Sequence, residues 1–323
     1  MSASVTREFA DVVRRGLTAP RKSLPAVLLY DEQGSALFEA ITELPEYYVT
    51  RTERAILERH ADTIAAQILT AAVGPVAVLE LGAGTATKTD LLLRALAQHR
   101  QDLHYYPADV SQAPLEHARQ RLAATMPALS VTPLVGTHGG VLRHVSTWEG
   151  SVVVLFLGSS IGNYENTAAA ALLTEVRVAA GPRGTLLLGV DREKPLDVLL
   201  PAYDDAAGVT AAFNRNVLTR INRELDGDFN VDTFRHVACW NDEAGAVEMH
   251  LESSVAQHVQ LRALQLTVPF AQGERIHTES SHKYSDERVQ TLFNHAALTS
   301  VVSFEDDQRW FSLQLARPAT NEA

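Results

Sequence analysis

The stretch RIHTESSHKYS, residues 275–285, gathers side chains that can bind a polar ligand. It offers a carboxylate at Glu279, a hydroxyl at Ser281 and an ammonium group at Lys283. It follows an apolar segment and precedes a predicted helix that begins at Asp286, so we expect it to be a surface loop. Surface loops are usually polar, and a solvated connection is therefore the alternative to a ligand-binding loop.

A second stretch, LELGAGTATKT at residues 79–89, places Gly82 and Gly84 directly after a short apolar run. Glycines in this position let the backbone approach a ligand at the carboxyl end of a strand. A dinucleotide-binding loop would have a third glycine where this sequence has Thr87. What remains is an acid-x-Gly-x-Gly loop that begins at Glu80, the form that class I methyltransferases use for S-adenosylmethionine.

Asp109 ends the second predicted strand, residues 103–111. An acid in this place binds the ribose in doubly wound nucleotide sites, since its carboxylate can accept hydrogen bonds from both ribose hydroxyls. A tight turn without a ligand is the alternative for the glycine loop alone. The strand, the loop and the acid together favour a nucleotide site.

Strands and helices alternate between residues 57 and 191, and this predicts a doubly wound parallel sheet. The predicted strands are residues 76–81, 103–111, 129–136, 150–163 and 184–191, and the predicted helices are residues 57–72, 88–99, 112–125 and 167–180. Two further strands within residues 298–318, joined by an acidic turn, would complete this sheet as a hairpin.

The pattern changes after residue 195. A long helix is predicted at residues 202–225, and strand-like segments follow at 234–241, 246–261 and 264–270. We therefore expect an α+β substrate-binding domain of residues 196–283, completed by residues 1–56. The S-adenosylmethionine-binding domain would be residues 57–195, completed by residues 284–323.

The composition, 46% hydrophobic and 21% charged, is that of a globular protein. The net charge of −11, without a Lys/Arg run, argues against a nucleic-acid partner. The single cysteine, Cys239, excludes an intramolecular disulfide and a thiolate-cluster metal site, and we expect it to be a buried small hydrophobe. Because we find no secretory signal and no membrane-spanning stretch, we expect a cytoplasmic protein. We also expect it to be a monomer and to act on a small molecule.

Six longer segments occur in an order that resembles one enzyme family. They are ELPEYYVTRTE, LELGAGTATKTDLLL, FLGSSIGN, YDDAAGVTAAFNRNVLTRINREL, VEMHL and GERIHTESSHKY. From about Lys22 to the C-terminus the chain resembles the S-adenosylmethionine-dependent histidine Nα-methyltransferases of ergothioneine biosynthesis, which have a Rossmann-like class I methyltransferase sheet. The same family contains fungal relatives that methylate the amine of tryptophan derivatives, so another aromatic amino acid or amine is the alternative substrate.

The resemblance implies a set of cofactor-binding residues. They are Gly82, Gly84, Lys88 and Asp109, with Thr137 and His138 near the adenine. The family usually has Asp-Phe or Thr-Tyr at the last pair, so His138 is a departure.

The resemblance also implies a set of substrate-binding residues. Asn163 and Tyr203 would hold the substrate carboxylate, Tyr47 would line the pocket, and Tyr30 would lie near the α-amine; Glu279 and Ser281 would bind the imidazole, with Met249 beside the ring. Without the resemblance, the simpler interpretations are favoured. Tyr30, Tyr47 and Met249 would be core residues, Asn163 a helix cap and Glu279 a solvated carboxylate.

The implied chemistry is in-line transfer of a methyl group to a neutral amine, repeated three times to give the betaine hercynine. We expect Tyr30 to act as the catalytic residue that orients the amine and relays its proton. No metal is expected, because His250, His277 and His282 lack the spacing of a metal site. A catalytically silent S-adenosylmethionine-binding module and a nicotinamide dehydrogenase are the less favoured alternatives.

Overall fold

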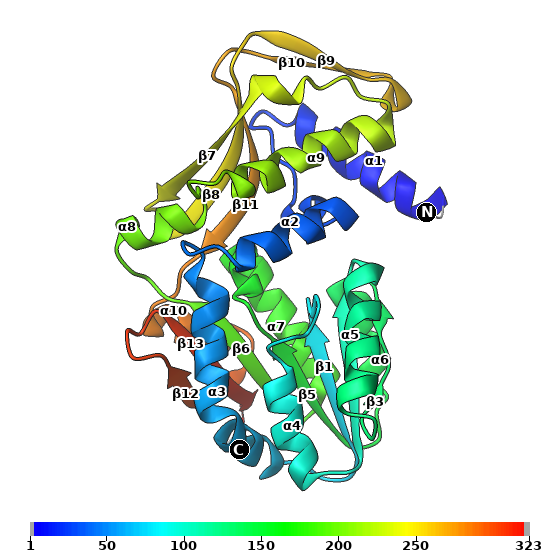
Figure 1. Cartoon of the computed structure of the whole chain (residues 1–323), viewed down its shortest axis with the longest axis vertical. Helices are drawn as coiled ribbons and strands as arrows, with labels where there is room; N and C mark the ends of the chain where they lie inside the picture. Colours follow the sequence, from blue (N-terminus) through cyan, green and yellow to red (C-terminus); the bar gives the residue numbers. More distant parts are fainter. Residues whose placement is uncertain (1–2, 320–323) are drawn as a thin grey trace. The chain divides into compact units, whose positions relative to one another are not determined.

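The computed structural model describes residues 3–319, with side chains from residue 7 onward, and the chain divides into two compact units (Figure 1). The first unit contains the residues up to Tyr48 together with Pro195–Ser281. The second contains Val49–Lys194 together with the residues from His282 onward. The predicted boundary between residues 56 and 57 falls inside helix α3, which runs over Tyr48–Leu69, whereas we predicted a helix only from residue 57. The two units divide at the start of this helix, between Tyr48 and Val49.

The second unit is built on a doubly wound sheet, which confirms the predicted fold class. Its strands lie in the order β12-β13-β6-β5-β1-β2-β3, with β4 also paired to β2. The bounds are β1 Val76–Leu81, β2 Leu103–Asp109, β3 Ser130–Val131, β4 Leu134–Val135, β5 Ser151–Phe156, β6 Thr185–Asp191, β12 Leu298–Glu305 and β13 Phe311–Pro318. The pairs from β6 to β3 are parallel, and the predicted terminal hairpin adds to β6 through the antiparallel strand β13.

Helices cover this sheet because its central strands are apolar on both faces. Every residue of β1, β5 and β6 is buried, and each fully buried Val or Leu side chain contributes about 1.5–3 kcal/mol. Helices α6 (His138–Val145), α7 (Asn166–Ala180) and α10 (Asp286–His295) share one core with β1, β5 and β6. Helices α3, α4 (Asp90–His99) and α5 (Gln112–Thr125) complete the unit, and α3 and α4 cross in front of the sheet in Figure 1.

The strand order reverses between β1 and β5, which are hydrogen-bonded neighbours. The chain proceeds from β1 to β2 in one direction and from β5 to β6 in the other. Ligands of open α/β sheets bind beyond the carboxyl ends of the strands at such a switch point. The glycine loop after β1 and the turn after β5, which contains the 3-10 helix η2 (Ser160–Asn163), both lie at this edge.

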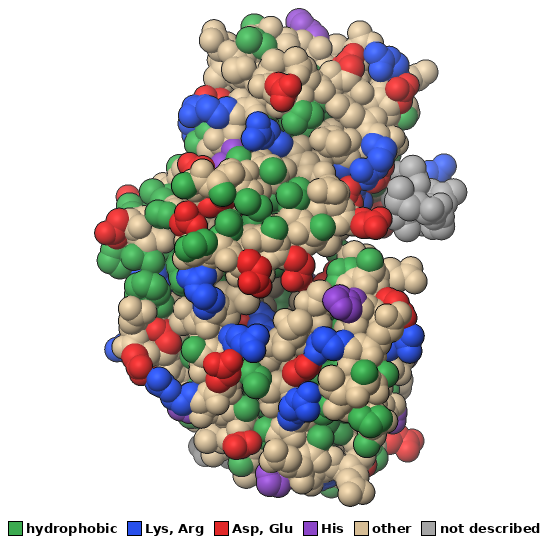
Figure 2. Space-filling view, viewed as in Figure 1, with side chains coloured by type: hydrophobic (Ala, Val, Ile, Leu, Met, Phe, Trp, Pro, Cys, Tyr) green, Lys and Arg blue, Asp and Glu red, His purple; other side chains and the backbone are tan. Residues whose placement is uncertain are grey.

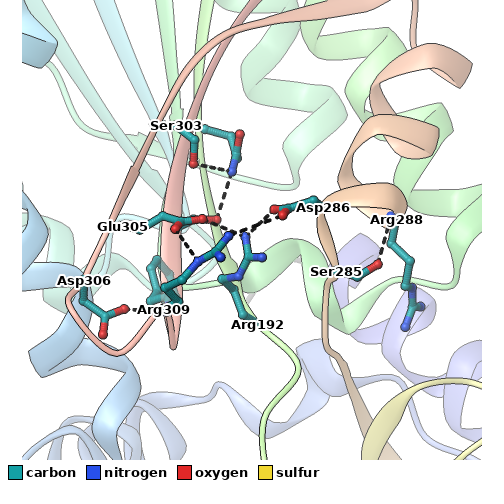
Figure 3. Close-up of polar contacts among 11 residues, drawn as sticks. Arg192, Ser285, Asp286, Arg288, Ser303, Glu305, Asp306 and Arg309 are labelled. Atoms are coloured by element: carbon teal, nitrogen blue, oxygen red, sulfur yellow. Dashed lines mark hydrogen bonds and ion pairs between the residues drawn. The ribbon is translucent and has the colours of Figure 1, made fainter.

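An ion-pair network fixes the terminal hairpin (Figure 3). Arg192, directly after β6, contacts Asp286 in the first turn of α10 at 2.6 Å and Glu305 at the end of β12 at 3.0 Å. Arg309 in the hairpin turn contacts Glu305 at 2.8 Å. The guanidinium of Arg192 lowers the pKa of the Asp286 carboxyl below its ordinary value.

The first unit is α+β. Its helices are α1 (Ala3–Thr18), η1 (Ala26–Leu29), α2 (Glu32–Thr42), α8 (Leu196–Leu199), η3 (Leu200–Ala202), α9 (Val209–Leu225), η4 (Val231–Thr233) and η5 (Arg262–Leu264). Its strands are β7 (Phe234–Asn241), β8 (Ala246–Ser253), β9 (Gln257–Leu261), β10 (Leu266–Phe270) and β11 (Arg275–His282). They form a sheet in the order β11-β8-β7 and a separate β9-β10 pair.

Three sequence predictions for this part of the chain were wrong in their secondary structure. The expected loop at residues 275–285 is mostly strand β11. The long helix begins at Val209 and not at residue 202, because the Asp205 carboxylate accepts hydrogen bonds from the N–H groups of Val209 and Thr210 and so caps the helix there. The segment 246–261 is two strands, separated by a turn in which the Ser253 hydroxyl donates to the Val255 carbonyl.

On the face shown in Figure 2, Lys and Arg side chains are interspersed with Asp and Glu side chains. Across the described residues, the structure contains no helix long and apolar enough to span a membrane.

Candidate active site

The glycine loop and Asp109 are in direct contact in the second unit. Gly82 and Gly84 have φ angles of +67° and +51°, a region that glycine adopts without strain. The Gly84 N–H donates to Asp109 Oδ2 at 3.0 Å, and the Ser111 N–H donates to Oδ1 at 2.9 Å. Leu81 pairs with Ala108 across β1 and β2, so the two strand ends deliver the loop and the acid to the same place.

This arrangement fits the ribose of S-adenosylmethionine. An ionised carboxylate has about four lone-pair positions, and backbone N–H groups use two of them in Asp109. The others can accept hydrogen bonds from two ribose hydroxyls. The Gly84 contact also ties the glycine loop to the end of β2.

Lys88 connects the glycine loop to the end of β5. Its ammonium group pairs with the carboxylate of Glu53, a fully buried residue of α3. Glu53 also accepts a hydrogen bond from the Gly158 N–H at 2.8 Å. A Cβ atom at Gly158, where φ is +73°, would lie 3.3 Å from the Lys88 nitrogen. An ammonium group has three donors, so Lys88 keeps donors for an anionic ligand group.

Glu53 was missed by the sequence analysis. It lies on a helix far along the chain from both of its partners, and no spacing pattern identifies it.

His138 is the first residue of α6, and Thr137 precedes it as the N-cap. The His138 Nδ1 is 2.9 Å from the Tyr164 hydroxyl, and the ring packs edge-on against Phe156 with centroids 5.3 Å apart. Burial lowers the pKa of His138, while Asp109 acts in the opposite direction, so the imidazole is neutral at neutral pH. A flat, neutral ring near Asp109 is compatible with an adenine contact, which stays a prediction.

Asn163 lies at the end of η2, past the carboxyl end of β5. A Cβ atom at the preceding Gly162 would come within 2.9 Å of the His282 carbonyl oxygen, so this close approach requires glycine. The packing of η2 against the end of β11 fixes the position of Asn163.

Glu80, the acid of the glycine-loop motif, is part of the core. It accepts hydrogen bonds from the Thr89 hydroxyl at 2.7 Å and from the Tyr105 hydroxyl. Burial is the main cause that raises its pKa from 4.5 to about 7. Glu80 therefore joins β1 to β2 and to the start of α4.

In the first unit, Tyr203 and Ser281 are in contact. Their hydroxyl oxygens are 2.8 Å apart, and both side chains are buried, as is Glu279 two residues before the serine. We predicted that Tyr203 would lie at the carboxylate end of histidine and Ser281 at the ring end, whereas their hydroxyls are in direct contact.

Met249 is buried on β8, the neighbour of β11. The Thr278 hydroxyl donates to the Met249 carbonyl at 2.9 Å, and this bond holds the two strands together next to Glu279. The thioether and the carboxylate therefore come from adjacent strands.

His236 and Asn214 hold the backbone of Tyr203 in place. His236 Nε2 is 2.8 Å from the Tyr203 carbonyl oxygen, and its Nδ1 is 2.9 Å from the Asn214 amide nitrogen. Since a carbonyl oxygen only accepts, Nε2 carries the proton and Nδ1 accepts from Asn214. Burial lowers the pKa of His236, which favours this neutral form. Neither residue was predicted, because the contact between them forms only when α9 packs against β7 in the folded unit.

Tyr30 and Tyr47 belong to one aromatic cluster. Tyr30 packs edge-on against Phe38 and Phe213, with ring centroids 5.5 and 5.4 Å apart, and Phe38 packs against Tyr47 at 6.1 Å. Asp31, next to Tyr30, accepts hydrogen bonds from Gly34 N–H at 2.8 Å and from the Asn216 amide at 2.7 Å. Tyr30 is thus held between α2 and α9, and Tyr47 packs against α2 through Phe38. The two phenylalanines of the cluster were not predicted.

The remaining polar residues of the 275–285 stretch have structural contacts. Lys283 is fully buried and pairs with Asp191 at 2.8 Å. His277 Nε2 is 2.9 Å from the Ser280 hydroxyl, and His282 is buried. The stretch is therefore divided between candidate substrate residues and structural ones.

Comparison with known proteins identifies the family. Residues 9–318 match the family model described as histidine-specific, S-adenosylmethionine-dependent methyltransferase. This chain belongs to that family. It is 44% identical to a histidine N-alpha-methyltransferase of Mycolicibacterium smegmatis, covering 94% of this chain and 93% of the relative.

Two fungal relatives are named for different activities. One is the ergothioneine biosynthesis protein 1 of Schizosaccharomyces pombe, 29% identical over 88% of this chain and 37% of that protein. The other is an L-tryptophan methyltransferase of Psilocybe serbica, 27% identical over 97% of this chain and 93% of that protein. The chain is an S-adenosylmethionine-dependent methyltransferase, as the sequence analysis predicted.

Proposed function

We propose that this enzyme methylates the α-amine of L-histidine three times to give hercynine, a step of ergothioneine biosynthesis. The observation that carries the proposal is the 44% identity to a histidine N-alpha-methyltransferase, which extends over 94% of the chain and so includes both units. The buried Glu279 and the Tyr203–Ser281 pair support a polar, ring-bearing substrate.

The second unit supplies the groups for the methyl donor. We propose that Gly82 and Gly84 allow close approach of S-adenosylmethionine, that Asp109 binds its ribose and that Lys88 binds its carboxylate. Thr137 and His138 would contact the adenine. S-adenosylmethionine supplies a methyl group bonded to a positively charged sulfur.

The amino-acid substrate is bound by polar groups at both of its ends. We propose that Asn163 and Tyr203 donate to the substrate carboxylate, since an amide and a phenol are both donors. Glu279 accepts the N–H of the imidazole, Ser281 bonds the other ring nitrogen, and Met249 packs beside the ring. Tyr47 lines the pocket through the aromatic cluster that it shares with Tyr30.

The reaction requires a neutral amine whose lone pair points at the methyl carbon. The lone pair forms the new C–N bond as the S–C bond breaks, and a proton leaves the nitrogen before each transfer. Because a free α-amine has a pKa of about 8 to 9, removing its proton at neutral pH costs only about 1–3 kcal/mol. We therefore assign Tyr30 the role of orienting the amine and passing its proton to solvent, and most of the catalysis to proximity and orientation.

The second candidate substrate is tryptophan, and the likeness to an L-tryptophan methyltransferase over 97% of this chain favours it. Tryptophan shares the amino-acid end with histidine and differs in the ring. The buried carboxylate of Glu279 favours a ring with more hydrogen-bonding capacity than indole.

Incubation with S-adenosylmethionine and either histidine, tryptophan or histamine, followed by mass spectrometry, tests the proposal. We expect histidine to gain three methyl groups. Histamine lacks the carboxylate, so its kcat/KM should be at least about a hundredfold lower. Equal values for histidine and histamine would contradict the carboxylate contact, and a preference for tryptophan would contradict the assignment of histidine.

We further propose that the enzyme acts as a monomer in the cytoplasm on a free amino acid and that the methyl transfer involves no metal. The relatives named for histidine and L-tryptophan support the free amino acid as substrate.

A further inference from the structure

Three side chains that are able to bind a metal meet on the sheet of the first unit. Cys239 of β7 and Glu248 and His250 of β8 each offer one ligand atom, and these atoms all lie within 4.8 Å of one another. Cys239 pairs directly with Glu248 in the antiparallel register, and Val237 pairs with His250. Alternate residues of a strand point to the same face, so the three side chains share one face of the sheet.

Two other residues of these strands point to the opposite face. Met249 lies between Glu248 and His250 on β8 and therefore points away from them. His236, which holds the backbone of Tyr203, alternates with Cys239 in the same way on β7. The cluster therefore lies on the face opposite to Met249 and His236, and His277 of β11 packs against the His250 ring with centroids 5.3 Å apart.

The carboxylate and the imidazole are already oriented toward each other. His250 Nε2 is 3.1 Å from Glu248 Oε2, and the Asn241 amide donates to Glu248 Oε1 at 2.7 Å. Among the described residues, the buried Nδ1 of His250 has no hydrogen-bond partner. A buried ring nitrogen without a partner is costly unless a proton donor or a metal ion satisfies it.

We propose that Cys239, Glu248 and His250 form a binding site for a thiophilic divalent ion such as Zn²⁺. Sulfur, imidazole nitrogen and carboxylate oxygen are the three ligand types that Zn²⁺ takes in proteins. Cys239 is partly exposed, contrary to our expectation of a buried cysteine, so an ion can reach it and water can complete a four-coordinate site.

Binding forms a metal–sulfur bond and releases the thiol proton to solvent, because the thiolate is the ligand.

The ligands cannot be recognised from their sequence spacing. Cys239 and Glu248 lie on either side of the β7–β8 turn, and only the register of that hairpin brings them together. No metal was predicted, because the histidines lack the spacing of a metal site and a single cysteine cannot form a thiolate cluster.

Titration of the untagged enzyme with Co²⁺, followed by absorption spectroscopy, tests the proposal. Cys239 is the single cysteine of the chain, so a thiolate-to-cobalt charge-transfer band reports this site alone. We expect the band to appear at one equivalent of Co²⁺ and to disappear on addition of Zn²⁺. Cys239→Ser should abolish it, and His250→Gln should weaken Co²⁺ binding at least about tenfold, as for loss of a metal ligand.

The matched control is His258→Gln, which removes an exposed histidine from β9 of the same unit and should leave the titration unchanged. A second measurement needs no variant: Zn²⁺ should slow the alkylation of Cys239 in the wild-type enzyme. Cobalt binding without a charge-transfer band, or an alkylation rate that Zn²⁺ does not change, would overturn the proposal.

Discussion

Glu279 is the residue on which the choice of substrate ring depends. Its buried carboxylate accepts the imidazole N–H in our proposal. Glu279→Ala should therefore lower kcat/KM for histidine roughly thirty- to a hundredfold, which corresponds to a loss of about 2–3 kcal/mol of transition-state stabilisation. Combining it with Met249→Val, which widens the ring pocket, should shift the preference toward tryptophan. The measurement is the ratio of kcat/KM for histidine over tryptophan in the wild type and both variants.

Glu252→Ala is the control for this experiment. Glu252 lies on β8 and pairs with Arg235 at 2.7 Å and Arg275 at 2.8 Å, away from the substrate residues. A histidine/tryptophan ratio that is the same in the wild type and the Glu279 variants would show that the carboxylate does not select the ring.

Asp109 should determine the affinity for S-adenosylmethionine. Asp109→Ala removes the proposed acceptor for two ribose hydroxyls and also leaves the Gly84 N–H without its partner. We expect binding to weaken by about 1.5–3 kcal/mol, roughly ten- to a hundredfold in Kd measured by calorimetry. Asp102→Ala is the control, because the Asp102 side chain is exposed and lies directly before β2. An unchanged Kd for Asp109→Ala would remove Asp109 from the cofactor site.

The contact between α9 and β7 holds part of the candidate substrate site. His236→Ala leaves the Tyr203 carbonyl without its donor and removes one of the two acceptors of the Asn214 amide, so the Tyr203 side chain should lose its fixed position. We expect the KM for histidine to increase about tenfold, for a loss of roughly 1–2 kcal/mol, while the Kd for S-adenosylmethionine stays the same.

His258→Ala serves as the control, because it removes an exposed imidazole from the same unit. An equal loss of affinity for both ligands would mean that His236 contributes to folding alone.

The link between β1, β2 and α4 should make stability depend on pH through Glu80. Its pKa is about 7 in the folded protein against an ordinary value of 4.5. Between these values the folded state keeps a proton that the unfolded state loses, so the contribution of Glu80 to stability is fully present below pH 4.5 and is lost as the pH rises through 7. The shift corresponds to about 3 kcal/mol.

Glu80→Gln cannot ionise, so it should lose this part of the pH dependence. The measurement is the free energy of unfolding in urea at several pH values between 4.5 and 8, with the exposed change Glu149→Gln as control. The prediction fails if the wild type and Glu80→Gln show parallel pH profiles.

Elements with strong local patterns could be predicted from the sequence. The apolar run VAVLEL is β1, and α5 has the predicted bounds Gln112–Thr125. Strand β11 could not be recognised, because its polar residues 278–282 are buried by tertiary contacts and not by an apolar face. Lys283, directly after the strand, is also buried and pairs with Asp191 of β6.

Part of the candidate site could likewise be predicted from the sequence. Gly82, Gly84 and Asp109 follow from the strand–loop–helix pattern, and their contact is present. Residues that act through distant partners, such as Glu53, Asn214, Phe213 and His236, have no sequence signal of their own. The contact between the Tyr203 and Ser281 hydroxyls was also not expected from their assigned roles.

Across the whole chain, the two ligands should protect different segments from amide hydrogen exchange. S-adenosylhomocysteine should slow exchange in the glycine loop and at Ser111, whose N–H groups contact Asp109. Histidine should slow exchange in β8 and β11. The β9–β10 pair provides an internal control that neither ligand should affect. Mass spectrometry of peptic fragments measures this, and unchanged exchange in β11 with histidine bound would contradict its role.

The position of β13 has a consequence for how the protein is made. This strand, Phe311–Pro318, lies inside the sheet between β6 and β12, although it is the last strand of the described chain. During synthesis on the ribosome, β6 is therefore an unpaired edge strand until β13 has been made and Leu315 can pair with Leu187. Such an edge is a template for pairing with other chains. Slow translation or premature termination after α10 should therefore produce aggregating nascent chains rather than a partly active enzyme.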